Sequence, residues 1–297
     1  MDAEFIAKAL GGCRAGAGWM ARCPAHDDRK PSLSLRDSSS GLVLLRCHAG
    51  CEQERVIEVL RSRGLWTNGR RRLVRSQAAA PDVGRQTVQY DAKRTEAALT
   101  IWQSAMPAAG TLVETYLGSR GLYLPAPPVL RLHAELKHPS VGQWPAMVAL
   151  VTRGSDGRSL AIHRTFLALD GARKAPVEPA KMMLGPCRGG AVRLAEPTNV
   201  LMIGEGIETC LAAMQASGYP AWAALSTSGL RSLDLPKDVR SVIVLADGDD
   251  VGEAAAQQCA RRWKHEGRHV RIARPPEGMD FNDMLMNRAS HSDEAAQ

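Results

Sequence analysis

The chain has 297 residues, which is enough for about two domains, or three if one of them is small. Hydrophobic residues make up 44% of the chain and charged residues 23%, a balance that excludes a largely disordered protein. The sequence lacks the ~18 consecutive apolar residues that a membrane span needs, and its start, MDAEFIAKALGG, lacks the apolar core of a secretory signal. We therefore expect a cytoplasmic globular protein with no membrane partner.

The formal net charge of +7 is unevenly distributed along the chain. Residues 1–80 hold 14 Lys and Arg against 8 Asp and Glu, and residues 81–195 hold the same numbers. Residues 196–297 reverse the balance, with 10 basic residues against 15 acidic ones. Two basic segments followed by an acidic one favour a front that binds a polyanion and a back that is rich in carboxylates.

The first 66 residues are predicted to form a compact domain that ends in an amphipathic helix, with Val56 and Leu60 on its buried face. The seven cysteines are an odd number in a chain that is not small, so a disulfide framework is not expected. Two short-spaced pairs stand out instead: Cys23 with His26, and Cys47 with Cys51.

These two pairs fit a structural zinc site, because zinc takes four sulfur or nitrogen ligands in a tetrahedron. Pro24 and Gly50 stand where tight knuckles need them. His48 stays open as a replacement for one cysteine, and Cys13 is a less favoured ligand. The alternative is that these side chains are unrelated members of a small core.

The middle of the chain begins with a basic stretch. Residues 67–92 are predicted to be a basic linker, with a helix starting near Asp91. Residues 93–195 mix helices and strands, and 147–152 and 160–169 are predicted strands on either side of a turn.

From residue 196 the pattern changes to alternating strands and helices. Strands are predicted at 200–204, 220–226, 241–246 and 269–275, with helices at 207–217 and 253–267 and a turn at 227–229. Continuous apolar strands joined by helical crossovers predict a parallel α/β sheet that is covered on both faces.

Acidic residues follow two strands of this predicted sheet. Glu205 comes after the first strand, and Asp247 and Asp249 come after the third. In a parallel sheet these positions meet at the carboxyl edge, where open α/β folds bind ligands. Converging carboxylates repel one another, and Mg²⁺ removes that repulsion while keeping some of its water. The alternative for the D-G-D-D segment is an exposed turn, and the further acids that would serve a second ion are Glu208, Asp250, Asp280 and Asp283.

Together these motifs resemble a known family. CPAHDDRKPSL with CHAGC resembles the zinc-binding domain of primases from phages, plasmids and integrative elements. GEGIETCLAA, LADGDDVGEAAAQ and DFNDML resemble the Toprim domain of the same proteins. YLGSRGL, GRSLAIHRTFLALDGARK and AKMMLG are similar to the basic N-terminal half of the primase catalytic core. One departure is the Cys47-x3-Cys51 spacing, which is wider than the C-x2-C of bacterial replicative primases.

The resemblance implies an α/β fold with a small zinc-binding domain, a basic α+β subdomain, and a Toprim-type parallel sheet with flanking helices. The implied boundaries are 1–66, 67–92, 93–195, 196–290 and a polar tail at 291–297. By the same resemblance, Glu205 is the general acid or base and also a ligand of the catalytic metal. The other ligands implied for that metal are Asp247, Asp249, Asp280 and Asp283. Arg164 and Lys181 are implied to bind the nucleotide or the template.

The function implied is a DNA primase, a nucleotidyltransferase that synthesises short RNA primers on single-stranded DNA for a mobile element or phage. Its cofactors would be structural Zn²⁺ and catalytic Mg²⁺ or Mn²⁺, and its substrates ribonucleoside triphosphates. Because the sequence holds no G-x-x-x-x-G-K-[ST] motif, a replicative helicase is expected as a separate partner. Two other functions stay open: a non-enzymatic zinc and Toprim scaffold that binds DNA in recombination or replication, and a Toprim nuclease.

Overall fold

The computed structural model describes residues 2–15, 18–29, 31–38, 42–66, 83–248, 250–276 and 279–286. The chain divides into two compact units, residues 1–80 and 81–297. Most of the predicted basic linker lies outside the described residues, and the helix expected near Asp91 begins earlier, at Val83. None of the described helices combines the length and the apolar character that crossing a bilayer requires.

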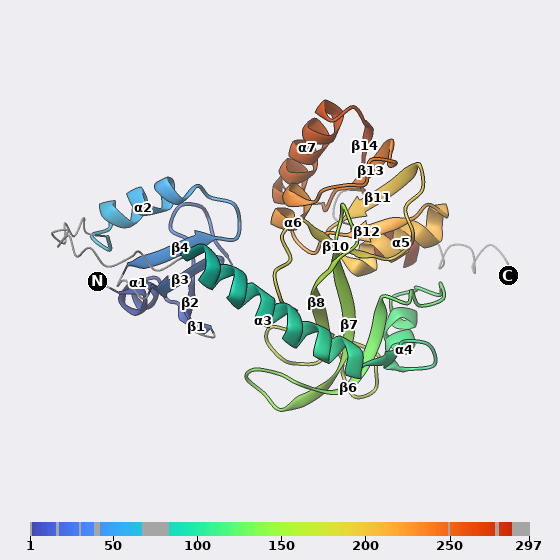
Figure 1. Cartoon of the computed structure of the whole chain (residues 1–297), viewed down its shortest axis with the longest axis horizontal. Helices are drawn as coiled ribbons and strands as arrows, with labels where there is room; N and C mark the ends of the chain where they lie inside the picture. The colour runs from blue at the N-terminus through green and yellow to red at the C-terminus, as the bar shows by residue number, and fades with distance from the viewer. Residues whose placement is uncertain are drawn as a thin grey trace. The chain divides into compact units, whose positions relative to one another are not determined.

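The first unit is a four-stranded antiparallel sheet flanked by two helices (Figure 1). Its strands follow one another in chain order, and its core confirms the predicted buried face of the second helix, with Val56 and Leu60 inside. The Asp2 side chain caps the first helix by accepting a hydrogen bond from the Phe5 N–H. The elements are α1 (Ala3–Ala9), β1 (Cys13–Ala15), β2 (Gly18–Ala21), β3 (Leu33–Asp37), β4 (Val43–Cys47) and α2 (Gln53–Ser62).

The second unit begins with a long helix and an antiparallel meander. The predicted strands 147–152 and 160–169 fall on β7 and β8, which pair with each other as expected. The elements are α3 (Val83–Ser104), β5 (Met106–Pro107), α4 (Leu112–Ser119), β6 (Leu130–Lys137), β7 (Gln143–Arg153), β8 (Ser159–Phe166), β9 (Lys181–Leu184) and β10 (Gly190–Arg193).

The rest of the second unit is the predicted parallel α/β segment. Its four strands are parallel and lie in the order β14-β13-β11-β12. The turn expected at 227–229 is wrong: a short helix begins there, because the Ser226 side chain accepts a hydrogen bond from the Gly229 N–H and caps it. The elements are β11 (Val200–Gly204), α5 (Ile207–Ser217), β12 (Ala221–Ala223), α6 (Thr227–Ser232), β13 (Ser241–Leu245), α7 (Asp250–His265) and β14 (His269–Ala273).

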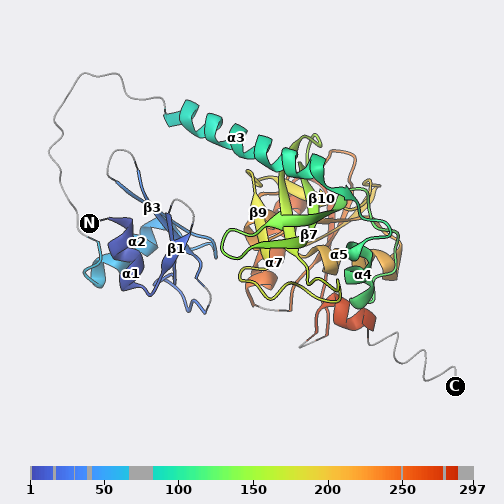
Figure 2. The same ribbon diagram turned by 90° about the horizontal axis from the view of Figure 1, so that it is seen from below.

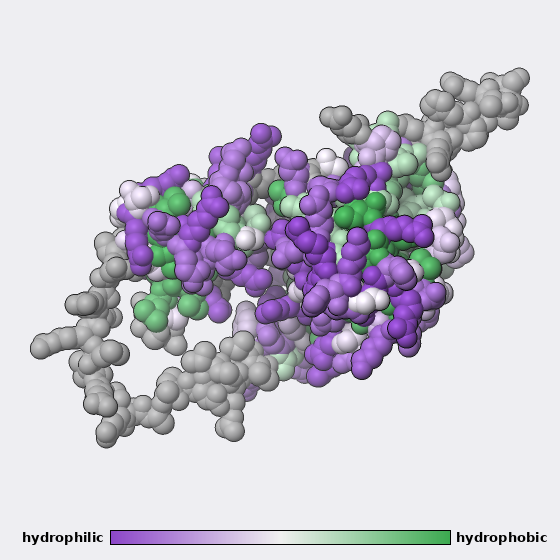
Figure 3. Space-filling view, turned by 90° about the horizontal axis from the view of Figure 1, so that it is seen from above, coloured by the Kyte–Doolittle hydropathy of each residue, from purple (hydrophilic) through white to green (hydrophobic). Residues whose placement is uncertain are grey.

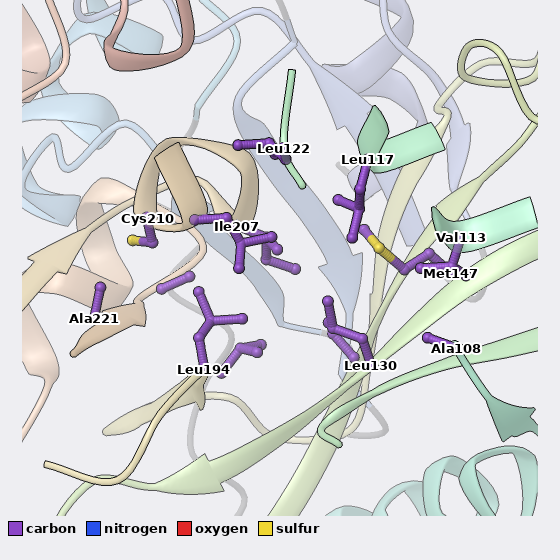
Figure 4. Close-up of a cluster of buried hydrophobic side chains, with 14 of the residues drawn as sticks. Ala108, Val113, Leu117, Leu122, Leu130, Met147, Leu194, Ile207, Cys210 and Ala221 are labelled. Atoms are coloured by element: carbon purple, nitrogen blue, oxygen red, sulfur yellow. The ribbon is translucent and has the colours of Figure 1, made fainter. Parts of the chain in front are cut away.

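The antiparallel and parallel halves form one sheet of ten strands. β10 joins them, because it pairs antiparallel with β7 on one side and with β12 on the other. A single hydrophobic core continues across this junction. Figure 4 shows Leu117 of α4 and Met147 of β7 in the same cluster as Ile207 and Cys210 of α5. The two predicted subdomains are therefore packed as one body, which keeps side chains from both in constant positions.

The sheet formed by β6 to β9 has a different cover on each face. One face packs against α4 and α5, through residues such as Met147 and Ala149. The other face packs against α3, through residues such as Val148 and Phe166, and Figure 2 shows α3 along that side. In the space-filling view of Figure 3, hydrophilic side chains cover most of the visible face, with small hydrophobic areas between them.

Candidate functional site

The four predicted zinc ligands converge in the first unit. The ligand atoms of Cys23, His26, Cys47 and Cys51 all lie within 4.8 Å of one another. His26 Nδ1 is 3.2 Å from Cys51 Sγ and 3.9 Å from Cys47 Sγ, close to the roughly 3.5–3.8 Å between neighbouring ligands of tetrahedral zinc. Three sulfurs and one imidazole nitrogen are a donor set that fits zinc. His48 is exposed and outside this group, so Cys51 is the fourth ligand.

Local backbone geometry brings the second pair of ligands together. Cys47 ends β4, and Gly50 has a φ of 97°, a conformation that glycine adopts without the strain that a side chain would add. The Gly50 N–H donates to the Cys47 carbonyl at 3.4 Å and closes the turn. The chain therefore reverses within one short knuckle and returns Cys51 to the site.

The three thiols differ in how easily they ionise. Burial, together with the neighbouring Cys47, raises the pKa of Cys23 to about 12. Burial also acts on Cys47, but hydrogen bonds from the Cys51 N–H and the Ser32 hydroxyl hold the pKa of Cys47 below its ordinary value. Crowded thiolates repel one another, so a bound cation is what allows all three to ionise.

Asp28 organises this site from behind the ligands, and sequence reasoning missed it. Its Oδ2 accepts hydrogen bonds from the Cys23 N–H at 2.6 Å and from the Ser32 hydroxyl at 2.6 Å. Its Oδ1 lies 3.6 Å from His26 Nε2, the imidazole nitrogen on the side away from the sulfurs. A carboxylate in this position fixes the orientation of a ligating histidine. The signal in the sequence is the acidic pair that directly follows CPAH.

The second site lies at the carboxyl ends of neighbouring parallel strands. β11 pairs with β13 so that Ile203 lies opposite Val244, and Glu205 and Asp247 follow the ends of these two neighbouring strands at the same edge of the sheet. Both residues are half-buried. The Leu225 N–H donates to the Glu205 carbonyl at 2.9 Å, and Leu225 itself has a φ of 69°, which is rare for a branched residue. The loop after β12 thus holds the backbone of Glu205.

The late acidic segment also approaches this edge. A Cβ at Gly248 would lie only 3.2 Å from the Met279 carbonyl oxygen, so Gly248 permits this close approach. Asp280 and Asp283 cap each other: Asp280 Oδ1 accepts from the Asp283 N–H at 2.7 Å, and Asp283 Oδ2 accepts from the Asp280 N–H at 3.0 Å. One oxygen of each carboxylate is therefore used in the cap.

The carboxylates at this edge fit a magnesium site. Mg²⁺ keeps several of its waters and is commonly held by one or two carboxylates together with substrate phosphates. Glu205 and Asp247 supply two such groups on adjacent strands. Asp249 lies outside the described residues, and within the described part of the chain only the cysteine and histidine group places three such ligand side chains together.

Glu208, which the sequence offered as a ligand of a second ion, has other partners. It lies in the first turn of α5 and is only 7% exposed. The Tyr116 hydroxyl of α4 donates to its Oε1 at 2.7 Å, and Lys181 Nζ of β9 donates to its Oε2 at 3.1 Å. Burial alone would raise the pKa of Glu208, but Lys181 and Tyr116 outweigh it and lower that pKa to about 2. Glu208 is therefore a permanent buried anion.

Two further side chains surround this ion pair, and neither was identified from the sequence. Burial and then the charge of Lys181 lower the pKa of His163 to about 4. The His163 side chain is buried, and its Nδ1 has no hydrogen-bond partner among the described residues. Partial burial of its ammonium group and repulsion from Lys181 lower the pKa of Lys174. Lys174, Lys181 and Glu208 thus carry more positive than negative charge.

Arg164 and Lys181, each predicted to bind the nucleotide or the template, lie on opposite faces of the sheet. In the antiparallel register, Lys181 lies opposite Thr165, whereas Arg164 lies opposite Met182. Successive residues of a strand point to opposite faces, so Arg164 is on the α3 side of the sheet and Lys181 on the α5 side. Arg164 is buried, and its Nη2 donates to the Met183 carbonyl at 3.2 Å. Its role in nucleotide or template binding stays a prediction.

Comparison with known families divides the second unit in two. Residues 92–194 match a family described as a domain of unknown function, DUF7146. Residues 200–291 match the Toprim domain family. No curated protein sequence matches the chain.

Several solved structures are similar to this chain at low sequence identity. One is the Aquifex aeolicus primase, with its zinc-binding and RNA polymerase domains, at 15% identity and a TM-score of 0.47, covering 98% of this chain and 81% of that one. Another is the DnaG catalytic core, at 17% identity and a TM-score of 0.40, covering 69% and 77%. A third is the primase fragment of the bacteriophage T7 primase-helicase protein, at 15% identity and a TM-score of 0.39, covering 65% and 72%.

The predicted fold class is confirmed. The chain combines a small unit carrying a cysteine and histidine metal group with a mixed sheet whose parallel part is flanked by helices. Glu205 and Asp247 lie inside the segment that matches the family description. This segment, residues 200–291, is the part of the chain that is similar to a Toprim domain.

Proposed function

We propose that the protein is a primase-type nucleotidyltransferase that synthesises short RNA primers on single-stranded DNA, for a mobile element or phage. The observation that carries the proposal is the pairing of β11 with β13, which brings Glu205 and Asp247 to the same carboxyl edge of the sheet, in the segment that matches the Toprim family. The cysteine and histidine metal group in the first unit is a second feature that supports the proposal.

In the proposed reaction, the 3′-hydroxyl of a growing primer attacks the α-phosphorus of a ribonucleoside triphosphate. A bond forms between the 3′-oxygen and the α-phosphorus, the bond to the β-phosphate oxygen breaks, and pyrophosphate leaves. Glu205 accepts the proton of the attacking hydroxyl. Asp247, with Asp249, Asp280 and Asp283, would hold Mg²⁺ or Mn²⁺. That ion would neutralise the charge that develops on the phosphates.

The remaining roles follow from charge. Lys181, whose side chain is 38% exposed, faces the same side of the sheet as α5 and would bind the triphosphate. The first unit would bind the single-stranded template, and the replicative helicase would be a separate protein. The structural zinc would hold that unit in its folded form.

The test is primer synthesis on mixed-sequence single-stranded DNA with labelled ribonucleotides and Mg²⁺. We expect short products from the wild type and at least ~100-fold less from Glu205→Ala or Asp247→Ala, because each removes a group that acts only in the transition state. Asp238→Ala is the matched control, since this acid is exposed in the loop before β13.

Three other outcomes would contradict the proposal. Products that persist in both variants would place the chemistry elsewhere. Binding of DNA without any products, unchanged in both variants, would favour the scaffold function. Cleavage of the template that depends on the same two acids would identify a Toprim nuclease.

A further inference from the structure

We propose that Glu208 is a positioning residue, a buried anion that fixes Lys181 for binding a nucleotide triphosphate, and not a ligand of a second metal ion. The inference deepens the proposed function, because it rests on Lys181 facing the nucleotide. It concerns three segments that are far apart in the sequence: α4, β9 and the first turn of α5.

Both carboxylate oxygens of Glu208 already accept hydrogen bonds. Oε1 accepts from the Tyr116 hydroxyl at 2.7 Å and Oε2 from Lys181 Nζ at 3.1 Å. Tyr116 is 1% exposed and Glu208 7%. A hydrated cation needs a carboxylate that is open to water, whereas this one lies between a buried hydroxyl and an ammonium group.

Charge balance explains why Lys181 needs a fixed anion. Lys174 lies close enough to Lys181 that each lysine's charge acts on the other, and Arg120 adds a third cation nearby. Without Glu208, like charges in a partly buried site would push the flexible lysine side chains apart into solvent. With Glu208, one buried anion holds Lys181 while leaving its side chain 38% exposed for an incoming phosphate.

The position of Glu208 in α5 connects Lys181 to the carboxylate edge. Glu205 is the first residue after β11, Gly206 caps α5, and Glu208 lies in the first turn of that helix. The hydrogen bond from Tyr116 ties this turn to α4, which packs in the same core (Figure 4). The lysine that would bind the triphosphate and the acids that would act on its α-phosphate are therefore held through one helix turn.

The experiment measures how ATP protects Lys181 from an amine-acylating reagent, read by mass spectrometry of the labelled peptide. It uses the full chain without template, in buffer without added Mg²⁺ and without a chelator, so that zinc is not removed. In the wild type we expect ATP to slow acylation of Lys181. In Glu208→Gln we expect roughly tenfold more ATP to be needed, the loss expected for one charge-assisted hydrogen bond.

Two more variants make the result specific. Tyr116→Phe keeps the charge of Glu208 and removes one of its hydrogen bonds. The ATP concentration that protects Lys181 in this variant should therefore be intermediate between those for the wild type and Glu208→Gln. Glu114→Gln is the control, because this exposed glutamate of α4 accepts only a hydrogen bond from the Gly110 N–H among the described contacts. Circular dichroism confirms that each variant is folded. If Glu208→Gln does not fold, Tyr116→Phe decides.

Several results would overturn the inference. One is a wild type in which ATP does not protect Lys181, and another is equal protection in Glu208→Gln. In primer synthesis, Glu208→Gln should raise the KM for ribonucleotides and leave the Mg²⁺ requirement unchanged. A higher Mg²⁺ requirement at constant KM would instead identify a metal ligand. Protection of Lys181 that depends on Glu208 in a protein that makes no primers would support the inference while rejecting the proposed polymerase.

Discussion

Asp28 shows how much of the zinc site depends on a residue that does not itself bind the metal. Its carboxylate receives the backbone N–H of one ligand, Cys23, and faces the outer nitrogen of another, His26. Hydrogen bonds from Cys23 and Ser32 outweigh the effect of burial and lower the pKa of Asp28, so it stays ionised. The two ligands of the CPAH segment are thereby oriented before the second pair of cysteines meets them.

Replacing Asp28 by Asn should weaken zinc binding by about 10–100-fold, because losing the carboxylate that orients a ligating histidine has effects of this size. Competition against a chromophoric zinc chelator measures the affinity. Asp27→Asn is the matched control, since the Asp27 side chain is 89% exposed. Equal losses in the two variants would show that the effect is one of general charge and not of orientation.

Glu205 and Glu208 are two acids at the start of one helix with different surroundings. Glu205 follows the end of β11, at the sheet edge where Asp247 follows β13, whereas Glu208 lies between Tyr116 and Lys181. From the sequence alone both are acids of the GEGIE segment, and nothing local distinguishes a metal ligand from a buried counter-ion. The distinction comes from partners that are 92 and 27 residues away.

At the level of the element, successive side chains of β8 point to opposite faces of the sheet and so meet different surroundings. His163 faces α5 and the lysines, and the next residue, Arg164, faces α3. Burial and Lys181, together with Arg164 and Lys174, lower the pKa of His163, while Glu208 opposes them. The strand therefore carries a neutral histidine beside the positive cluster and buries an arginine on its other side.

His163 should make the stability of the second unit depend on pH. The pKa of His163 is about 4 in the folded chain, against an ordinary value of 6.5. Between these two pH values His163 is therefore protonated in the unfolded chain and neutral in the folded chain. Stability should fall as the pH decreases, by about 2 kcal/mol between pH 6.5 and 5 from this one group. In His163→Gln that part of the pH dependence should be absent.

Urea unfolding at pH 7.5, 6.5 and 5.0 measures the effect as the difference between the variant and the wild type. The free energy of unfolding of the wild type should fall relative to that of His163→Gln toward pH 5, because only the wild type loses stability through this residue. His265→Gln, which changes an exposed histidine of α7, is the control and should follow the wild type. A constant difference between His163→Gln and the wild type would contradict the assignment.

At the level of the whole molecule, the two units differ in what stabilises them. The first has a small core, in which Leu33, Leu35 and Leu45 pack against two short helices together with the metal-ligating cysteines. The second has a ten-stranded sheet with continuous cores on its faces. In a domain with so small a core we expect bound zinc to supply much of the stability, since a structural zinc contributes about 10 kcal/mol or more.

Removing zinc should therefore unfold the first unit and leave the second intact. Limited proteolysis of the full chain, with and without a strong chelator, should show new cleavage within residues 1–66 only. Cys51→Ser should have the same effect without a chelator, whereas Cys13→Ser, an exposed cysteine outside the ligand group, should not. New cleavage in the second unit after chelation would show that the zinc also stabilises that unit.

The sequence by itself determined the four parallel strands and the helices α5 and α7 after residue 196, the two short-spaced pairs of candidate zinc ligands, and the place of Glu205 and Asp247 after the strand ends. These are consequences of local periodicity and short spacing, which one stretch of chain specifies alone. Only the tertiary structure decided that β10 joins two subdomains, that Arg164 and Lys181 face apart, and that Glu208 pairs with Lys181 and Tyr116. Those outcomes depend on strand register and on contacts between distant segments, and packing selects them after the local elements have formed.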